Sequence, residues 1–272
     1  MELIPGDGPF AHFRGGSGPP VLLVPGLGGT RSFFAAQLDA LLPHYTVFTW
    51  DQRGSGTRSH EAFCHEPAEL AADVAVLIKT QTTGTAVVVG HSMGAAVCQH
   101  AALAYPDLVS GLVLSAAWAG PNPAFTALLR ARREILRHAG AEAYLLASTG
   151  IASQPGSAES HLAGLADRAR ELDVSTELAR LDALASFDLR TKIAGISQPV
   201  EILAVADDQL TPVTMAEDLM ARLAHAQLTT LAVGGHLAPR SQPAAFNAAL
   251  LQALSRLHAP QPSSRAFSQP AG

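Results

Sequence analysis

The chain has 272 residues, 48% of them hydrophobic and 15% charged, which is enough apolar material for the core of one large α/β domain. Its 18 Lys and Arg residues against 23 Asp and Glu residues give a formal charge of −5, and the lack of a basic stripe argues against a nucleic-acid partner. No apolar run resembles a signal peptide or approaches the roughly 18 residues that span a bilayer, so we expect a cytoplasmic protein without a membrane partner.

Short β-rich runs recur along the chain, with helix-period segments between most of them. The runs are continuously apolar rather than alternating, as expected for strands that are covered on both faces. This succession predicts an α/β fold with a doubly wound, mostly parallel sheet. The predicted strands are 21–24, 46–51, 86–90, 111–116, 199–206 and 226–233, and the helices between them include 33–42, 68–80 and 95–105.

The rhythm changes between Trp118 and Ser197, where helical patterns follow one another at 123–140, 141–149, 157–173 and 175–187. We therefore predict a helical cap inserted between two strands of the sheet. Such an insertion would lie over the carboxyl ends of the strands, where open α/β sheets bind ligands. The predicted division is a core of residues 1–117 and 198–258, a cap of residues 118–197, and a disordered tail of residues 259–272.

The stretch VVVGHSMGAAV, residues 87–97, runs from a predicted strand into a predicted helix. Its centre matches G-x-S-x-G with Ser92 in the middle. A nucleophile at such an elbow needs small neighbours, so that strand and helix can approach each other, and it lies beside the N–H groups that begin the helix. Ser92 is therefore our predicted nucleophile. The alternative is a serine that only caps the helix.

Two later stretches could supply the base and the acid that a serine nucleophile needs. Asp207 and Asp208, in AVADDQLTPV, both follow the strand 199–206. His236, in AVGGHLAP, is one of 11 histidines, but it lies late in the chain on a strand-end loop and after two glycines. The order serine, acid, histidine is typical of a catalytic triad on an α/β sheet. Either aspartate could instead be an ordinary loop residue.

The stretch VLLVPGLGGTRSFF places a glycine-rich loop between a strand and a helix. Backbone N–H groups in such a loop can bind an oxyanion, and we expect the N–H groups of Leu27 and Met93 to do so. A second interpretation is a dinucleotide fingerprint, with Gly26 and Gly28 in the loop and Asp51 ending the next strand. Arg31 occupies the third glycine position of that fingerprint, which weakens this interpretation.

We expect no metal, no cofactor and no structural disulfide. SHEAFCHEP, residues 59–67, gathers potential metal ligands, but His60 and His65 are five residues apart, whereas a zincin helix needs a spacing of four. The two cysteines lie in different contexts: Cys64 is in this polar stretch, and Cys98 is in the predicted helix after Ser92. We expect Cys98 to be a small buried hydrophobic residue.

Residues of the predicted cap are candidates for the substrate pocket. Trp118, Phe125 and Arg132 either face the pocket or pack within the insertion. Arg132, together with Arg130 and Arg133, could bind a substrate carboxylate, but acidic residues in the same insertion favour a solvated helix face for this group.

Taken together, these stretches resemble the α/β-hydrolase superfamily over almost the entire chain. In that family the acid commonly lies four residues before a proline, as Asp208 does before Pro212, so the resemblance implies that Asp208 and not Asp207 is the acid. Pro25 stands where the oxyanion loop of the family usually has a histidine, which leaves the backbone donor at Leu27 in place. The matching stretches are PGLGGTRSFF, WDQRGSGTRS, GHSMG and GGHLAP.

Within the superfamily, YTVFTWDQRGSG, ILAVADDQLTPVTMAEDL and GGHLAPRSQPAAFNAALLQAL most resemble the aminoacrylate hydrolase (carbamate hydrolase) group of pyrimidine degradation, and the 3-oxoadipate enol-lactonase group is similar. The resemblance implies a serine hydrolase that cleaves a small ester, enol-lactone or amide-like compound through an acyl-enzyme. Aminoacrylate-type enamine hydrolysis without an acyl-enzyme, a cofactor-free haloperoxidase and a non-catalytic ligand receptor remain alternatives. The expected partner is a small-molecule substrate, and a homodimer is left open.

Overall fold

The computed structural model describes residues 2–4, 12–61, 66–154, 162 and 164–259, so the predicted tail lies outside these ranges except for Ala259. Within them, eight strands form one sheet in the order β1-β2-β4-β3-β5-β6-β7-β8. β1 and β2 are antiparallel to their neighbours, and every other neighbouring pair is parallel. The strands are β1 (Glu2–Ile4), β2 (His12–Gly15), β3 (Pro20–Val24), β4 (Thr46–Trp50), β5 (Ala86–His91), β6 (Val109–Ser115), β7 (Val200–Val205) and β8 (Ala226–Leu231).

The prediction of a doubly wound, mostly parallel sheet is confirmed. Each predicted strand exists, with its ends displaced by no more than two residues. The two antiparallel strands at the N-terminal edge were not predicted. β2 has the sequence HFRG, which is too short and too polar to resemble the continuous apolar runs of the central strands.

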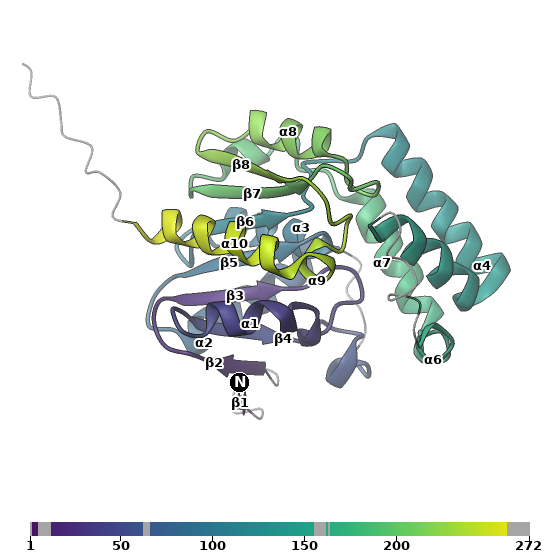
Figure 1. The fold of residues 1–272 in the computed structure, drawn as a ribbon, viewed down its shortest axis with the longest axis horizontal. Coiled ribbons are helices and arrows are strands. Elements are labelled where there is room, and N and C mark those ends of the chain that lie inside the picture. Colours follow the sequence, from purple (N-terminus) through teal and green to yellow (C-terminus); the bar gives the residue numbers. More distant parts are fainter. Residues whose placement is uncertain (1, 5–11, 62–65, 155–161, 163, 260–272) are drawn as a thin grey trace, which may run out of the picture.

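Helices cover both faces of the sheet (Figure 1). Because successive side chains of a strand point to opposite faces, Leu22 and Val24 join the core on one face, whereas Val21 and Leu23 join the core on the other. The first core is closed by α2 (Pro67–Gln81), α3 (Met93–Ala104) and α8 (Val213–Ala221), and the second by α1 (Ala35–Leu41), α9 (Ala238–Ser241) and α10 (Pro243–His258).

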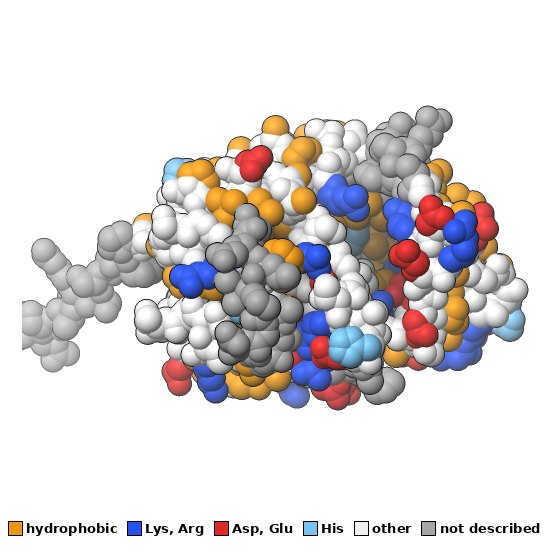
Figure 2. Space-filling model, turned by 90° about the horizontal axis from the view of Figure 1, so that it is seen from below, with side chains coloured by type: hydrophobic (Ala, Val, Ile, Leu, Met, Phe, Trp, Pro, Cys, Tyr) orange, Lys and Arg blue, Asp and Glu red, His pale blue; other side chains and the backbone are white. Residues whose placement is uncertain are grey.

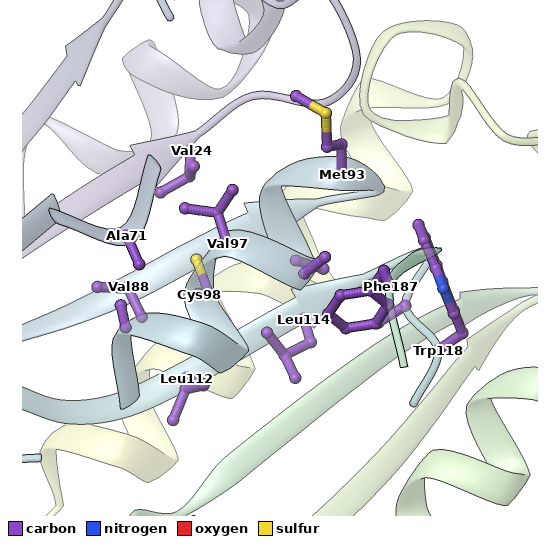
Figure 3. Close-up of a cluster of buried hydrophobic side chains, with 14 of the residues drawn as sticks. Val24, Ala71, Val88, Met93, Val97, Cys98, Leu112, Leu114, Trp118 and Phe187 are labelled. Atoms are coloured by element: carbon purple, nitrogen blue, oxygen red, sulfur yellow. The ribbon is translucent and has the colours of Figure 1, made fainter. Parts of the chain in front are cut away.

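Figure 3 shows part of the first core, in which Val97 and Cys98 of α3 pack with Val88 of β5, Leu112 of β6 and Ala71 of α2. Cys98 of α3 is fully buried there as a free thiol, and burial raises its pKa above the ordinary value. The expectation that Cys98 acts as a small hydrophobic residue is thus confirmed. Cys64 lies outside the described residues.

Between β6 and β7 the chain forms α4 (Pro123–Ala152), α6 (Leu165–Glu171) and α7 (Val174–Ser186), which we call the cap. Gly140 interrupts α4 with φ 84° and ψ 176°, so the helix is broken where the sequence patterns 123–140 and 141–149 meet. Of the predicted helical segment 157–173, only residue 162 and residues from 164 onwards are described. The cap lies beyond the carboxyl ends of the parallel strands (Figure 1), and its side chains Phe125 and Leu181 join the first core.

The topology opens a crevice at one place in the sheet. β3 lies between β4 and β5, and the chain leaves β3 toward α1 on one face but leaves β5 toward α3 on the other. Ligands bind at such a switch point, outside the carboxyl ends of the strands. The loop after β3 and the turn after β5 therefore meet beneath the cap. In the part of the chain that is described, no helix is long and apolar enough to cross a bilayer.

Packing of α10 against the sheet generates the first prediction. Leu250 is fully buried in the second core, whereas Gln252 on the same helix is exposed. We expect Leu250→Ala to lower the free energy of unfolding by about 2–5 kcal/mol, because the truncation leaves a cavity in a close-packed core. The control Gln252→Ala should change it by no more than about 0.5 kcal/mol. Urea denaturation measures both, and equal effects would contradict this packing.

Candidate active site

Ser92 lies at a tight elbow between β5 and α3. Its backbone has φ 54° and ψ −120°, a left-handed conformation that is uncommon for any residue but glycine. A Cβ atom on Gly94 would lie 2.1 Å from the carbonyl oxygen of Val24, and one on Gly90 would lie 2.4 Å from the carbonyl oxygen of Gly94. Neither position has room for a side chain. The glycines of the motif are therefore required for β3, β5 and α3 to approach so closely.

The hydroxyl of Ser92 does not cap the helix. No hydrogen bond joins its side chain to the first turn of α3. Its Oγ instead lies 2.9 Å from Nε2 of His236. This contact contradicts the interpretation of Ser92 as only a capping residue.

His236 links Ser92 to Asp208. Nδ1 of His236 donates to Oδ2 of Asp208 at 2.9 Å, and this hydrogen bond leaves Nε2 as the acceptor for the hydroxyl of Ser92. The three residues come from the loops after β5, β7 and β8. All three are buried: Ser92 is 7% exposed, Asp208 4% and His236 5%. The structure thus brings the three predicted residues into one hydrogen-bonded chain.

The carboxylate of Asp208 is held by several donors. Its Oδ1 accepts from the backbone N–H groups of Leu210 and Thr211 at 2.8 and 3.0 Å, and the hydroxyl of Thr211 donates to Oδ2 at 2.8 Å. Burial by itself would raise the pKa of Asp208, but the charge and hydrogen bond of His236, with the bonds from Thr211, lower it to about 2. Asp208 therefore stays ionised beside the imidazole.

Asp207 has a different partner. Its Oδ1 accepts from the backbone N–H of Gly235 at 2.7 Å, so this aspartate holds the loop that carries His236. Gly235 has φ +61°, and a Cβ atom there would lie 2.6 Å from the backbone nitrogen of Gln154 in the cap segment. The geometry separates the two adjacent aspartates: Asp208 contacts the imidazole, and Asp207 fixes the backbone beside it.

A second histidine, His91, lies next to the chain of three. Its ring stacks on Phe33 with centroids 4.8 Å apart and lies 5.1 Å from the ring of His236, while Nδ1 is 3.1 Å from Oγ of Ser115. Burial lowers the pKa of His91 far below its ordinary value, and the charge of His236 lowers it further. Nδ1 of His91 thus contacts Ser115, whereas the ring that contacts the hydroxyl of Ser92 is that of His236. Sequence reasoning did not single out His91.

The predicted oxyanion donors lie beside the elbow. Gly26 to Gly29 form a turn in which the N–H of Gly29 donates to the carbonyl of Gly26 at 3.0 Å. A Cβ atom on Gly26 would lie only 3.3 Å from Cβ of Ser92, so this loop contacts the nucleophile directly. Met93 is the first residue of α3, where N–H groups have no partner within the helix. The N–H groups of Leu27 and Met93 take no part in the hydrogen bonds of the described turns and caps.

Asp51 is not placed to bind the ribose of a dinucleotide. It is buried, and its carboxylate accepts from the backbone N–H groups of Arg31 and Thr57, both at 2.9 Å. The hydroxyl of Thr57 and the guanidinium of Arg31 complete its contacts at 2.9 and 2.5 Å. Asp51 therefore fixes the loop after β4 against the loop after β3. Because its carboxylate is engaged in these contacts, the structure does not support the dinucleotide interpretation.

A cavity of about 230 Å³ lies between Ser92 and the cap. Figure 2 shows the molecule hollowed between the core and the cap, with charged side chains around the hollow. Phe125 and Arg132, two of the three residues predicted for the substrate pocket, line the cavity. Trp118 is not among its lining residues, because the indole packs behind Phe125 with ring centroids 5.0 Å apart and is buried there. The cavity is small, since pockets for drug-sized ligands typically have about 300–1,000 Å³.

The three arginines at 130, 132 and 133 do not share one environment. Arg130 is exposed, and Arg133 pairs with Asp182 at 3.2 Å on the outside of the cap. Arg132 is 8% exposed and points inward, where Nε donates to Ser148 Oγ at 3.1 Å. For Arg132 the expected solvated helix face is therefore wrong. The periodicity of α4 places residues 125, 129, 132 and 136 on its buried face, and this spacing was the signal that sets Arg132 apart.

The cap also contributes polar residues that sequence reasoning missed. Tyr144 and Glu177 line the cavity beside Arg132, and Arg180 pairs with Glu177 at 3.2 Å. Among the described residues, no group of three His, Cys, Asp or Glu side chains is placed to hold a metal. Cys64 and His65 of the stretch SHEAFCHEP lie outside the described ranges.

Comparison with known proteins agrees with this architecture. The sequence profile of the alpha/beta hydrolase family matches residues 21–249. A protein of Caulobacter vibrioides (strain NA1000 / CB15N) named "Putative carbamate hydrolase RutD" is 33% identical over 241 residues, which cover 86% of this chain and 89% of that protein. The fold is similar to the crystal structure of a hydrolase from Pseudomonas aeruginosa PA01, with a TM-score of 0.78 and 28% sequence identity. This match covers 90% of this chain and 93% of that hydrolase. An enol-lactonase from Burkholderia xenovorans LB400 shares the fold at 21% sequence identity and a TM-score of 0.76. That match covers 93% of this chain and 100% of the enol-lactonase.

The elbow yields a stability prediction. Gly94→Ala would place a methyl group 2.1 Å from a backbone oxygen that belongs to β3, so strand and helix must separate. We expect a loss of about 1–3 kcal/mol or more in the free energy of unfolding. Gly84→Ala is the matched control, because its added Cβ meets nothing within 4 Å. Thermal unfolding of both variants tests this, and a Gly94→Ala protein as stable as the control would refute the close approach.

The low pKa of Asp208 yields a pH prediction. A carboxyl whose pKa is lowered on folding stabilises the protein above its unfolded pKa, near 4, and that contribution is lost as the pH falls toward about 2. The free energy of unfolding should therefore fall more steeply between pH 5 and about pH 3 in the wild type than in Asp208→Asn. Asp39→Asn, which removes an exposed carboxylate, is the control. Urea denaturation at a series of pH values measures the slopes, and parallel slopes for the wild type and Asp208→Asn would contradict the prediction.

Proposed function

The chain belongs to the alpha/beta hydrolase family and is a hydrolase, and from the geometry around Ser92 we propose that it cleaves a small acyl compound through a serine acyl-enzyme. The observation that carries this proposal is the hydrogen-bonded chain from Ser92 through His236 to Asp208 at the wall of a cavity. The small volume of the cavity favours a small substrate such as an ester, an enol-lactone or an amide- or carbamate-like compound.

In the first half of the proposed reaction, Ser92 attacks the carbonyl carbon. Nε2 of His236 takes the hydroxyl proton as the bond from Oγ to carbon forms, and the carbonyl electron pair moves onto oxygen. The N–H groups of Leu27 and Met93 would stabilise that oxyanion, and one such donor is typically worth about 10²–10³ in kcat. The imidazolium, stabilised by Asp208, then gives its proton to the leaving group as the bond to carbon breaks.

In the second half, water removes the acyl group. His236 takes a proton from the water as its oxygen attacks the acyl carbon, and the tetrahedral intermediate again places its charge at the two N–H groups. Ser92 leaves as Oγ and recovers its proton from His236, so the enzyme returns to its starting state. Because Nε2 of His236 is the nitrogen that contacts Ser92 Oγ, at 2.9 Å, His236 is the base in both halves.

The alternative routes differ in what they require of Ser92. An enamine could be hydrolysed by water activated at His236 without an acyl-enzyme, and a ligand receptor needs no proton transfer. The contact of 2.9 Å between Ser92 Oγ and His236 Nε2 favours the acyl-enzyme, because it is the contact that activates a serine. The relative named as a carbamate hydrolase supports the amide-like class of substrate. We further propose that the protein acts in the cytoplasm on a small-molecule substrate.

The test measures kcat/KM on short acyl esters, a carboxylated enol-lactone and aminoacrylate. Ser92→Ala should lower kcat/KM on the best substrate by about 10³-fold or more, because the nucleophile is lost while the oxyanion donors remain. Ser255→Ala, which removes an exposed hydroxyl on α10, is the matched control and should leave the rate unchanged.

A direct readout of the intermediate completes the experiment. Acid quenching during turnover, followed by mass spectrometry, should find the acyl group on the peptide that contains Ser92. Equal rates for wild type and Ser92→Ala on every compound, with no acylated peptide, would contradict the proposed mechanism.

A further inference from the structure

Arg132 is a buried cation in the wall of the cavity that holds Ser92. A guanidinium carries five N–H donors. In Arg132, Nε donates to Ser148 Oγ at 3.1 Å, and Nη2 donates to Tyr144 OH at 2.9 Å. Both acceptors are neutral hydroxyl groups. Among the described residues, Arg132 makes no other hydrogen bond and no ion pair.

The carboxylate that shares this wall is already engaged. Oε1 of Glu177 accepts from the hydroxyl of Tyr144 at 2.5 Å, and Oε2 pairs with Nη1 of Arg180 at 3.2 Å. Tyr144 therefore stands between Arg132 and Glu177, accepting from one and donating to the other. Glu177 therefore pairs with Arg180 and not with Arg132.

The fold prevents Glu177 from turning to neutralise Arg132. Arg180 is fixed to the core, because its Nη2 donates to the carbonyl of Gly54 at 3.0 Å and to the hydroxyl of Ser55. Glu177 lies one helical turn from Arg180 on α7 and would lose that pair if it moved. A buried ion without a counter-ion is strongly unfavourable. The arrangement therefore leaves Arg132 prepared for an anion that enters the cavity.

We propose that the substrate carries a carboxylate a few bonds from its reactive carbonyl, and that Arg132 binds this carboxylate. The inference rests on the proposed function of Ser92. Ser92 and His236 line the cavity from the core, whereas Arg132 and Ser148 line it from the cap, so one molecule in the cavity can reach both sides. Apolar side chains such as Phe125, Leu145 and Leu184 line the same cavity and suit the carbon chain between the two groups. A planar guanidinium matches the two oxygens of a carboxylate.

The experiment compares substrates that differ only in this charge. Monomethyl succinate carries the carboxylate on the acyl part, and methyl succinamate replaces it with a neutral amide of nearly the same shape. O-acetylglycolate and its amide place the same groups on the leaving alcohol. The pair with the larger preference for the carboxylate identifies the part of the substrate that Arg132 contacts.

We expect the wild type to prefer a carboxylate over its amide by at least about tenfold in kcat/KM. Arg132→Gln should lower kcat/KM for the carboxylate by about 30-fold or more and change that of the amide by less than about threefold, because only the ionic contact is lost. Arg132→Lys, which keeps the charge but not the planar fork, should recover part of the preference. Arg130→Gln removes an exposed charge from the same helix and should leave the preference unchanged.

Two results would overturn the proposal. One is a wild type that shows no preference for either carboxylate. The other is an Arg132→Gln variant that loses the same factor on carboxylate and amide, which would indicate a structural role for Arg132.

Binding separates this inference from the proposed function. Titration calorimetry of Ser92→Ala with succinate should detect binding that disappears in the double variant Ser92→Ala/Arg132→Gln. If neutral esters are cleaved with a requirement for Ser92 but succinate does not bind, the anion site is refuted and the hydrolase mechanism stands. If succinate binds through Arg132 but Ser92→Ala leaves hydrolysis unchanged, the anion site stands and the mechanism fails.

Discussion

β5, α3 and the loop after β3 meet at Ser92 so closely that Gly90 and Gly94 have no room for a Cβ atom. This packing forces the backbone of Ser92 into a left-handed conformation and holds its hydroxyl at the edge of the sheet, away from the first turn of α3. It also places the glycine-rich loop against the nucleophile. The acid and the base can then reach Ser92 from the ends of β7 and β8, because parallel strands bring their carboxyl ends to one edge.

The loops that surround this elbow are held by part-buried polar contacts rather than by regular structure. Asp51 fixes the loop after β4 through Arg31 and Thr57, and Asp207 fixes the loop that carries His236. Each of these carboxylates accepts from backbone N–H groups, which position the main chain itself. The rigidity of the core side of the cavity follows from these contacts, since a group aimed at a reacting atom must not relax during the reaction.

Much of this arrangement was predictable from the sequence, for a physical reason. The central strands are continuously apolar, and the predicted site residues directly follow the ends of three of them, so the topology alone brings Ser92, Asp208 and His236 to one edge. β1 and β2 were missed because short polar edge strands lack that pattern. The buried charges of the cap were missed for another reason. Helical periodicity shows which face of α4 and α7 is buried, but not that Arg132 and Glu177, 45 positions apart in the chain, share a tyrosine between them.

The cap does more than cover the cavity. The backbone N–H of Leu237, next to the base His236, donates to the carbonyl of Ala152 at the end of α4 at 3.2 Å, and Gly235 lies against Gln154, which hydrogen-bonds Gln242 at 2.9 Å. The insertion that supplies Arg132 thus also supports the loop that carries the base. Substitutions in the cap that shift α4 would therefore act on proton transfer as well as on substrate selection. The core alone sets the position of the nucleophile, whereas the position of its base depends on both parts of the chain.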